Sequence, residues 1–305
     1  MDYRIVVIAL GLMLLAACGN VKDQSPSGRL SIVTTTGMIE DAVKNIVKDS
    51  ADVQALMGPG VDPHLYKATQ GDLERLTSAH VIFYNGLHLE GKMGEVLSKL
   101  GVRKPVVAVA DQIDSTKLKS APNYGYAIDP HVWFDISLWT EAVITAKKAM
   151  QEIDSVNAGY YEQNAKAYIA ELEALHLWVK EEIGKIPADQ RILITAHDAF
   201  GYFGEAYNIE VRGLQGISTL SEYGLKDVSD LVNFIVKNQI KAVFVETSVP
   251  QRAINAVVEG CKERGFDVKI GGNLYSDAMG AKGTPEGTYI GMVRANVNTI
   301  VNALK

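Results

Sequence analysis

The stretch SVNAGYYEQNAKAYIAELEALHLWVKEEIGKI, residues 155–186, decides how the rest of the chain is organised. It contains no proline, and its two glycines lie near its ends. We expect one helix of about 30 residues, which would be about 45 Å long at a rise of about 1.5 Å per residue. A second helix is expected directly before it, over SLWTEAVITAKKAMQEID. A helix of this length in the middle of a 305-residue chain indicates a stiff connection between two halves.

Short β-rich runs alternate with helical patterns on both sides of this stretch. The expected strands cover residues 29–36, 53–58, 81–86 and 106–110 in the first half, and 192–196, 209–216, 241–248 and 268–272 in the second. Such alternation indicates parallel sheets covered by helices. We therefore predict an α/β fold of two lobes, each with a mostly parallel four-stranded sheet flanked by helices, joined by one long backbone helix. A single large doubly wound domain with a long crossover helix is the alternative.

The N-terminal sequence MDYRIVVIALGLMLLAACGN has the pattern of an export signal. One arginine precedes an apolar run from Ile5 to Ala17, which is shorter than the ~20 residues of a membrane span and is typical of a signal peptide. The run ends in Leu-Ala-Ala-Cys, which resembles a bacterial lipobox, where the chain is cleaved before a cysteine that becomes lipidated. We expect lipidation at Cys18; an ordinary signal peptide with a chance cysteine is the alternative.

These patterns divide the chain into five segments. The expected boundaries are a signal peptide at 1–17, a lipidated flexible tether at 18–28, an N-terminal α/β lobe at 29–154, the linking helix at 155–186 and a C-terminal α/β lobe at 187–305. The mature protein is expected to be exported and held by its lipid at a bacterial membrane, in the periplasm or on the outer face of the cell membrane.

Composition and missing motifs exclude several functions. The net charge is −6 and no Lys/Arg cluster forms a stripe, so no nucleic-acid partner is expected. With Cys18 lipidated, Cys261 has no partner for an intramolecular disulfide and is expected to be a buried apolar residue. The sequence has no P-loop GxxxxGK[ST] and no HExxH motif. Any ATP-driven step must therefore use another chain.

The tripeptide Asp-Pro-His occurs twice, in GPGVDPHLYK and in YAIDPHVWFD. Its two histidines, His64 and His131, lie in loops that follow strands of the first half. His197 directly follows the strand ILITA, and Asp277 comes shortly after VKIGG. Ligands of open α/β sheets collect outside the carboxyl ends of the strands. We therefore expect these four side chains to meet at one cleft, two from each lobe.

Three imidazoles and a carboxylate form a ligand set for a transition metal, because calcium and magnesium prefer mostly oxygen. Zinc accepts such ligands in a tetrahedron with Zn–N distances of about 2.0–2.1 Å. Manganese prefers more oxygen and would suit a bidentate Asp277 better. The set by itself does not choose between the two metals.

Three further carboxylates are candidates for orienting the imidazoles from outside the ligand set: Asp62, Asp129 and Glu246. The alternative for the first two is an Asp-Pro pair that only fixes a turn. The alternative for Glu246 is a solvated acid at a strand end. His88 follows a strand and is a candidate for lining the mouth of the cleft, whereas the two remaining histidines are expected to be structural or exposed.

Seven segments, in order along the chain, carry a resemblance to a known family. They are GVDPHLYKAT, FYNGLHLE, IDPHVWFD, ILITAHDAFGYF, GLQGIST, FVETSVP and GGNLYSDAMG with the following GTPEGTYIGM. Together they span the mature chain and resemble the metal-binding class of ABC-transporter solute-binding proteins, called cluster A-I or cluster 9, with its TroA, ZnuA and PsaA types. The tail GGNLYSDAMGAKGTPEGTYIGMV is most similar to the TroA type.

The resemblance implies two α/β lobes joined by one long helix, with a metal at the lobe interface. His64 and His131 match the first two ligands of the family, and Asp277 matches the last. The third ligand is His in zinc-binding and TroA-like members and Glu in several manganese-specific ones; here it is His197, which favours zinc or mixed use. The loop QIDSTKLKSAPNYGYA lacks the histidines that zinc-specific members often carry, which is evidence against dedication to zinc alone.

The sequence therefore predicts a binding protein and not an enzyme. It would capture Zn²⁺ or Mn²⁺ outside the cytoplasm and deliver the ion to an ABC permease driven by a cytoplasmic ATPase. A metal-dependent hydrolase is the alternative if Asp277 does not bind the metal, because a catalytic zinc keeps one position open for water. A surface adhesin is the other alternative. Release of the ion is expected to need only a small lobe or loop movement, since a stiff linking helix opposes a wide hinge motion of the lobes.

Overall fold

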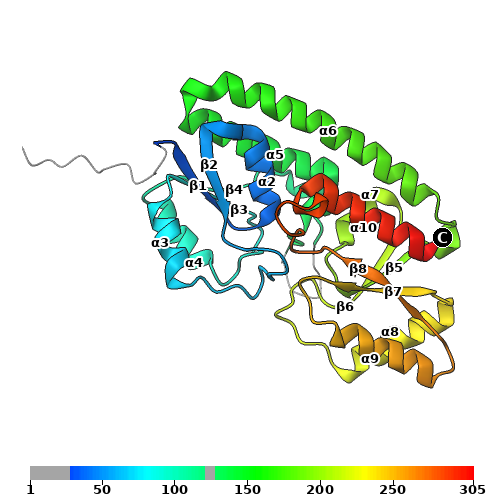
Figure 1. The fold of residues 1–305 in the computed structure, drawn as a ribbon. Helices are drawn as coiled ribbons and strands as arrows, with labels where there is room; N and C mark the ends of the chain where they lie inside the picture. The colour runs from blue at the N-terminus through cyan, green and yellow to red at the C-terminus, as the bar shows by residue number, and fades with distance from the viewer. Residues whose placement is uncertain (1–27, 121–127) are drawn as a thin grey trace, which may run out of the picture.

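The structure is a computed structural model that describes residues 28–120 and 128–305 (Figure 1). The predicted signal peptide, the lipobox with Cys18 and the tether up to residue 27 lie outside the described residues. Within the two described ranges, no helix has both the length and the apolar character needed to cross a membrane.

The N-terminal sheet has four strands, all parallel, in the order β2-β1-β3-β4. They are β1 (Leu30–Thr34), β2 (Ala51–Ala55), β3 (Val81–Tyr84) and β4 (Val106–Ala108). Successive side chains face opposite sides of the sheet. Ile32 therefore packs in a core with α2 (Gly37–Val47), and Val33 packs in another core with α3 (Gln70–Ser78) and α4 (Gly94–Gly101).

The C-terminal lobe also has four strands, and they form two hydrogen-bonded parallel pairs, β5-β6 and β7-β8. They are β5 (Ile192–His197), β6 (Glu210–Gln215), β7 (Ala242–Glu246) and β8 (Lys269–Leu274). β5 and β7 lie side by side, so the two pairs continue each other across the lobe (Figure 1). The helices of this lobe are α7 (Gly201–Tyr207), α8 (Leu225–Asn238), α9 (Arg252–Glu263) and α10 (Tyr289–Leu304).

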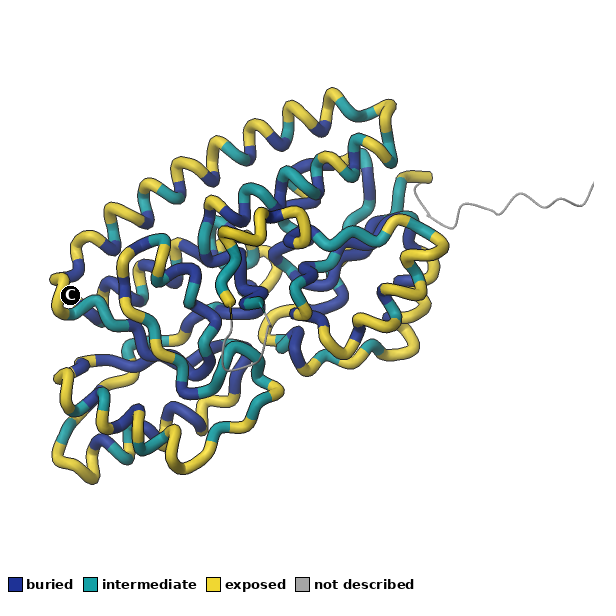
Figure 2. The backbone as a smooth tube through the Cα atoms, turned by 180° about the vertical axis from the view of Figure 1, so that it is seen from behind, coloured by how far each residue is buried: buried dark blue, intermediate teal, exposed yellow. Residues whose placement is uncertain are grey.

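The predicted linking helix is present as α6 (Ala158–Gly184), preceded by a 3-10 turn at Ser155–Asn157 and by α5 (Ile136–Ile153). Its 27 residues span about 40 Å, so it runs along both lobes (Figure 1). The helix buries one stripe and exposes the rest, as the alternation of buried and exposed residues along it in Figure 2 shows. The buried residues are Tyr161, Ala165, Tyr168, Leu172, Leu175, Val179 and Ile183.

One continuous apolar core joins the two lobes. It contains side chains from β1 and β3, from α2, α5, α6, α7 and α10, and from β5 and β7. Two smaller cores lie on the outer faces, one under α3 and α4 and the other under α8 and α9. Cys261 is buried in the second of these, as a small apolar residue would be. Because α6 packs against α2 and α5 of the N-terminal lobe and against α7 and α10 of the C-terminal lobe, a wide separation of the lobes would break the shared core.

Candidate metal centre

Three histidines and one aspartate from both lobes come together where the two sheets face each other. The candidate ligand atoms of His64, His131, His197 and Asp277 all lie within 4.8 Å of one another, and all four residues are buried. His64 Nε2 is 3.2 Å from His131 Nε2 and 3.6 Å from Asp277 Oδ2. His131 Nε2 is 3.4 Å from Asp277 Oδ1, and His197 Nε2 is 3.3 Å from Asp277 Oδ2.

These separations match the edges of a small coordination polyhedron. A tetrahedron whose centre lies about 2.0–2.1 Å from each corner has edges of about 3.3–3.4 Å. The nitrogen–nitrogen and nitrogen–oxygen distances of 3.2–3.6 Å in the cluster scatter around that value. Both oxygens of Asp277 face imidazoles, so the carboxylate can offer one or two ligand atoms. A four-coordinate and a larger coordination shell are both within reach of the same four residues.

Several of the ligand atoms lack a hydrogen-bond partner although they are buried. Among the residues that the structure describes, His197 Nε2 and both oxygens of Asp277 are in this state. A buried polar atom without a partner costs free energy, so such atoms are rare in folded proteins and tend to mark functional groups. A cation among the four side chains would bind His197 Nε2 and one or both oxygens of Asp277. The donor set therefore fits a divalent transition metal.

The His131 imidazole is held by the aspartate of its own tripeptide. Asp129 Oδ1 accepts hydrogen bonds from the backbone N–H of His131 at 3.0 Å and from its ring Nδ1 at 2.7 Å. The ring proton on Nδ1 leaves Nε2 free to face the centre. The loop is fixed further by Asn85, whose side-chain amide donates to the Pro130 carbonyl at 3.0 Å. Asn85 itself belongs to a turn organised by Glu90, whose carboxylate accepts from Asn85 N at 2.7 Å.

The His197 imidazole is held by a carboxylate from the neighbouring strand. His197 ends β5 and Glu246 ends β7, so the two residues lie at the same edge of the lobe. Glu246 accepts from His197 N at 2.8 Å and from His197 Nδ1 at 2.5 Å. The arrangement repeats that of His131 with the acid supplied by another element. It again presents Nε2 to the centre.

The His64 imidazole is held differently. Asp62 Oδ1 accepts from the backbone N–H of His64 at 2.8 Å and of Leu65 at 3.4 Å, and it makes no hydrogen bond to the His64 ring. Its other oxygen, Oδ2, accepts from the hydroxyl of Thr219 in the C-terminal lobe at 2.6 Å. Sequence reasoning did not single out Thr219, although GLQGIST is one of the segments that carry the family resemblance.

Asp277 lies in a loop that both lobes hold in place. Just before it, the Asn296 side chain on α10 accepts from Tyr275 N at 2.9 Å and donates to the Tyr275 carbonyl at 2.7 Å. The indole N–H of Trp133 donates to the Ser276 carbonyl at 3.0 Å. Trp133 follows His131 by two residues, so one buried indole connects the loops of two ligands.

The electrostatics of the centre divide the imidazoles into two kinds. Burial alone would lower the pKa of His131, but the carboxylates of Asp129 and Asp277 outweigh it and raise that pKa to about 9. The pKa of His197 is also raised well above its usual value, because Glu246 and Asp277 outweigh the cost of burial. Burial lowers the pKa of His64 to about 3, and the two neighbouring imidazoles add to this effect.

The pKa of Asp277 moves the opposite way from that of an isolated buried acid. Burial by itself would raise this pKa, but His197 and His131 hold it well below its usual value. In the absence of a metal, these shifts favour the charged forms of Asp277, His131 and His197 and the neutral form of His64.

The other histidines lie outside the cluster. His88 is not part of the cluster of candidate ligands. It is exposed and lies in a turn with a positive φ of 64°. His80 accepts from Ser31 N at 2.9 Å, and His176 on α6 pairs with the Tyr207 hydroxyl at 3.0 Å. These contacts give both residues structural roles.

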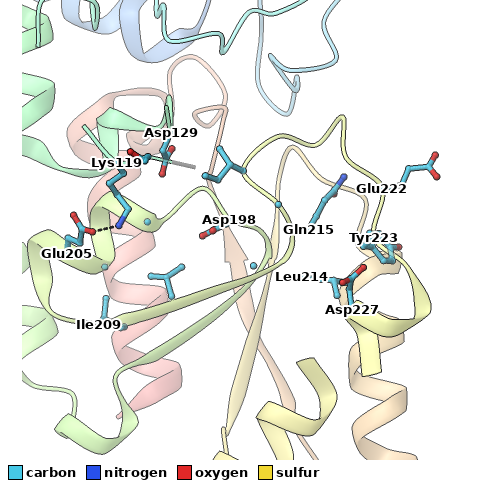
Figure 3. A pocket seen from close by; sticks show the side chains of 17 residues that line it. Lys119, Asp129, Asp198, Glu205, Ile209, Leu214, Gln215, Glu222, Tyr223 and Asp227 are labelled. Carbon is cyan, nitrogen blue, oxygen red and sulfur yellow. Dashed lines mark hydrogen bonds and ion pairs between the residues drawn. The ribbon is translucent and has the colours of Figure 1, made fainter. Parts of the chain in front are cut away.

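A polar cavity of about 780 Å³ lies beside the centre (Figure 3). Asp129, which orients His131, and Asp198, which follows His197, both line it. Lys119 also lines the cavity and is paired with Glu205. Burial raises the pKa of Asp198, and the nearby Asp129 carboxylate adds to the shift. Sequence reasoning missed Asp198, which its position directly after His197 could have indicated.

The fold and the centre define a two-lobed α/β protein with a buried set of metal-type ligands between its lobes. The family model described as "Zinc-uptake complex component A periplasmic" matches residues 32–303. The chain belongs to this family. The resemblance to metal-binding solute-binding proteins that the sequence carries is therefore confirmed.

Individual relatives are similar over nearly the full chain. The manganese-binding lipoprotein MntA of Bacillus subtilis is 52% identical over 292 residues, which are 95% of each chain. The metal ABC transporter substrate-binding lipoprotein SloC of Streptococcus mutans is 32% identical over 309 residues, covering 98% of this chain and 97% of SloC. The solved structure of the periplasmic zinc-binding protein TroA from Treponema pallidum has a TM-score of 0.89 and 47% identity, and the match covers 90% of this chain and 99% of TroA. The predicted fold class, with its long helix between two α/β lobes, is confirmed by this likeness.

Proposed function

We propose that the chain is the extracytoplasmic substrate-binding protein of an ABC importer for a divalent transition metal, zinc or manganese. One observation carries the proposal. Three imidazole nitrogens and a carboxylate from both lobes converge in a buried cluster with 3.2–3.6 Å between neighbouring ligand atoms. The ion is the cargo: the four side chains replace its water shell, and the surrounding carboxylates and backbone hold them ready.

Each residue of the centre has a role in this proposal. His64, His131, His197 and Asp277 bind the ion, and none is catalytic. Asp129 and Glu246 fix the tautomer and direction of their imidazoles, which raises the basicity of the ligand nitrogens. Asp62 fixes the backbone of the His64 loop. Relatives with both manganese-binding and zinc-binding names support a centre that accepts either metal.

The partners and location follow from the same assignment. The relative SloC is named as an ABC transporter substrate-binding lipoprotein. We infer that this chain delivers its ion to a permease with a cytoplasmic ATPase, and that it is exported and anchored to a bacterial membrane through lipid at Cys18. The proposed division of the chain keeps a signal peptide at 1–17, a tether at 18–28, lobes at 29–154 and 187–305, and the linking helix at 155–186.

The hydrolase and adhesin alternatives receive no support from the relatives, whose names describe binding and transport of metals. The geometry also disfavours a hydrolase. A catalytic metal needs an open position for water. Here all four candidate ligands lie within 4.8 Å of one another and are buried, so the protein itself fills a tetrahedral shell.

Thermal unfolding of the metal-stripped mature protein tests the proposal. A ligand that binds only the folded state adds about 2.7 kcal/mol of stability at a free concentration of 100 Kd. We expect Zn²⁺ and Mn²⁺, and not Ca²⁺, to raise the unfolding temperature at one equivalent. His131→Ala should lose the rise and His88→Ala, which alters an exposed histidine, should keep it. A wild-type protein that responds to neither transition metal would contradict the proposed function.

A further inference from the structure

The three imidazoles of the centre are not held equally. The rings of His131 and His197 each donate from Nδ1 to a buried carboxylate, at 2.7 Å and 2.5 Å. Among the described residues, no side chain or backbone group forms a hydrogen bond with Nδ1 of His64; its ring makes its one hydrogen-bond contact inside the cluster, with His131. The direction of the His64 ring therefore depends on the backbone that carries it.

Among the residues that the structure describes, one side chain fixes that backbone by hydrogen bonds. Asp62 accepts from the N–H groups of His64 and Leu65, which closes the turn that presents the imidazole. Asp62 thus orients His64 through the backbone of the turn, whereas Asp129 and Glu246 orient their histidines through the rings. A shift of the Asp62 carboxylate moves the turn, and the ring moves with it.

The position of Asp62 is set from the other lobe. Its second oxygen accepts from Thr219 Oγ1 at 2.6 Å, a contact between residues 157 positions apart. Thr219 lies in the segment between β6 and α8, and this segment is tied to the end of β6. Gln215, the last residue of β6, donates from its amide to the carbonyls of Thr219, at 2.8 Å, and of Ser221. The His64 turn is thereby attached to the C-terminal lobe.

We propose that Thr219 is a positioning residue of the metal centre, which holds His64 against the other three ligands by fixing Asp62 across the lobe boundary. The inference rests on the proposed function. It makes the Thr219 hydroxyl one of the groups that set how long the ion stays bound. A cavity of about 410 Å³ lined by Asp62, Thr219, Val249 and Pro250 adjoins this hydrogen bond. When the bond is absent, the turn has room to move, and His64 is the ligand that leaves first.

The rate of Zn²⁺ release from the full mature protein into excess chelator tests the proposal. Thr219→Val keeps the shape of the side chain and removes the hydroxyl, so we expect release to be about tenfold faster, the scale of one charge-assisted hydrogen bond. Thr219→Ser keeps the hydroxyl and should release close to the wild-type rate. Thr116→Val is the matched control, because Thr116 also donates its hydroxyl to a carboxylate, that of Asp114, in an exposed turn.

A double-variant cycle separates positioning from a general loss of structure. Asp62→Asn can still accept from the two backbone N–H groups, but it replaces the oxygen that accepts from Thr219 with an amide N–H donor. If the two side chains act through each other, Asp62→Asn with Thr219→Val should release zinc no faster than the faster single variant. Additive effects, or a Thr219→Val protein that releases at the wild-type rate, would overturn the inference. Failure of the wild-type protein to bind Zn²⁺ at all would instead overturn the proposed function.

Discussion

The two Asp-Pro-His tripeptides share a sequence and a backbone turn, yet their imidazoles have different surroundings. In each, the aspartate accepts from the backbone N–H of the histidine, at 2.8 Å for Asp62 and His64 and at 3.0 Å for Asp129 and His131. Only Asp129 also holds the ring of its histidine, at 2.7 Å. Asp62 instead uses its second oxygen to reach the other lobe. One tripeptide orients its ligand by itself, and the other depends on a distant residue.

The pKa values of the two histidines differ along with their hydrogen bonds. The pKa of His131 is raised to about 9, whereas that of His64 is lowered to about 3. Burial lowers the pKa of both residues, and only His131 has two carboxylates in contact to reverse the effect. The comparison teaches that a repeated motif can present two imidazoles to one centre with pKa values shifted in opposite directions and with different hydrogen-bond support.

Removal of either imidazole should have the largest effect. We expect His64→Ala and His131→Ala to weaken Zn²⁺ binding to a similar degree, because each provides one nitrogen of the cluster. The loss should exceed the ~10–100-fold that removal of an outer hydrogen-bond partner typically causes. Competition with a chelator of known affinity measures both variants. A His64→Ala protein that binds like the wild type would show that the first tripeptide is not part of the site.

The pH dependence of metal affinity should come from His131 and His197 and not from His64. The raised pKa values favour the doubly protonated imidazolium form of both residues without metal, and the ion must displace a proton from each to bind. Affinity should therefore fall as the pH falls, by up to about 100-fold per pH unit if two protons are released. Proton release in weakly buffered solution measures the number directly. Release of no protons near pH 7 would contradict the assigned charges.

Substitution of the two aspartates should separate the tripeptides. Asp129→Asn removes the carboxylate that fixes the His131 ring, and we expect a loss of ~10–100-fold in Zn²⁺ affinity. It should also reduce the proton release, because the pKa of His131 loses a main cause of its increase. Asp62→Asn keeps an acceptor for the backbone and should lose less affinity. Equal losses in both variants would remove the proposed distinction between the loops.

Substitution of Leu65 or Trp133, which follow the two tripeptides closely, should have the smallest effects, and these should appear in the free energy of unfolding. Trp133 is 1% exposed, and its indole N–H donates to the Ser276 carbonyl, so Trp133→Phe leaves a buried acceptor without its partner. We expect this to cost about 1–3 kcal/mol of unfolding free energy. Leu65 is 45% exposed, and Leu65→Ala should change stability by no more than about 0.5 kcal/mol. Urea unfolding of the metal-free proteins compares them, and a larger loss for Leu65→Ala would reverse the expected order.

Much of the fold could be predicted from the sequence because its signals are local. The long helix was placed within three residues at each end, since neither proline nor a central glycine interrupts it. The eight strands found in residues 28–120 and 128–305 are all predicted by short apolar runs next to helical patterns. The short helix α7 was missed because its seven residues, Gly201–Tyr207, are too few for a periodic pattern. The C-terminal strands form two hydrogen-bonded pairs, β5-β6 and β7-β8. This division depends on the distance between β5 and β7, which the sequence of neither strand indicates.

The centre was predictable to the extent that topology places strand ends together. His197 and Glu246 end neighbouring strands, so their contact follows from the order of the strands. The contact of Asp62 with Thr219 joins positions 157 residues apart in two loops, and loops carry no periodic signal. For the same reason the exposed position of His88, in a turn with positive φ, could not be derived from its place after a strand.

The most direct test of the account is a crystal structure of the Zn²⁺-loaded protein with anomalous data collected at the zinc edge. We expect one strong peak between the lobes, about 2.0–2.2 Å from Nε2 of His64, His131 and His197 and from a carboxylate oxygen of Asp277. A peak at another place, or a loaded crystal in which one of the four side chains points away from the ion, would contradict the centre as described.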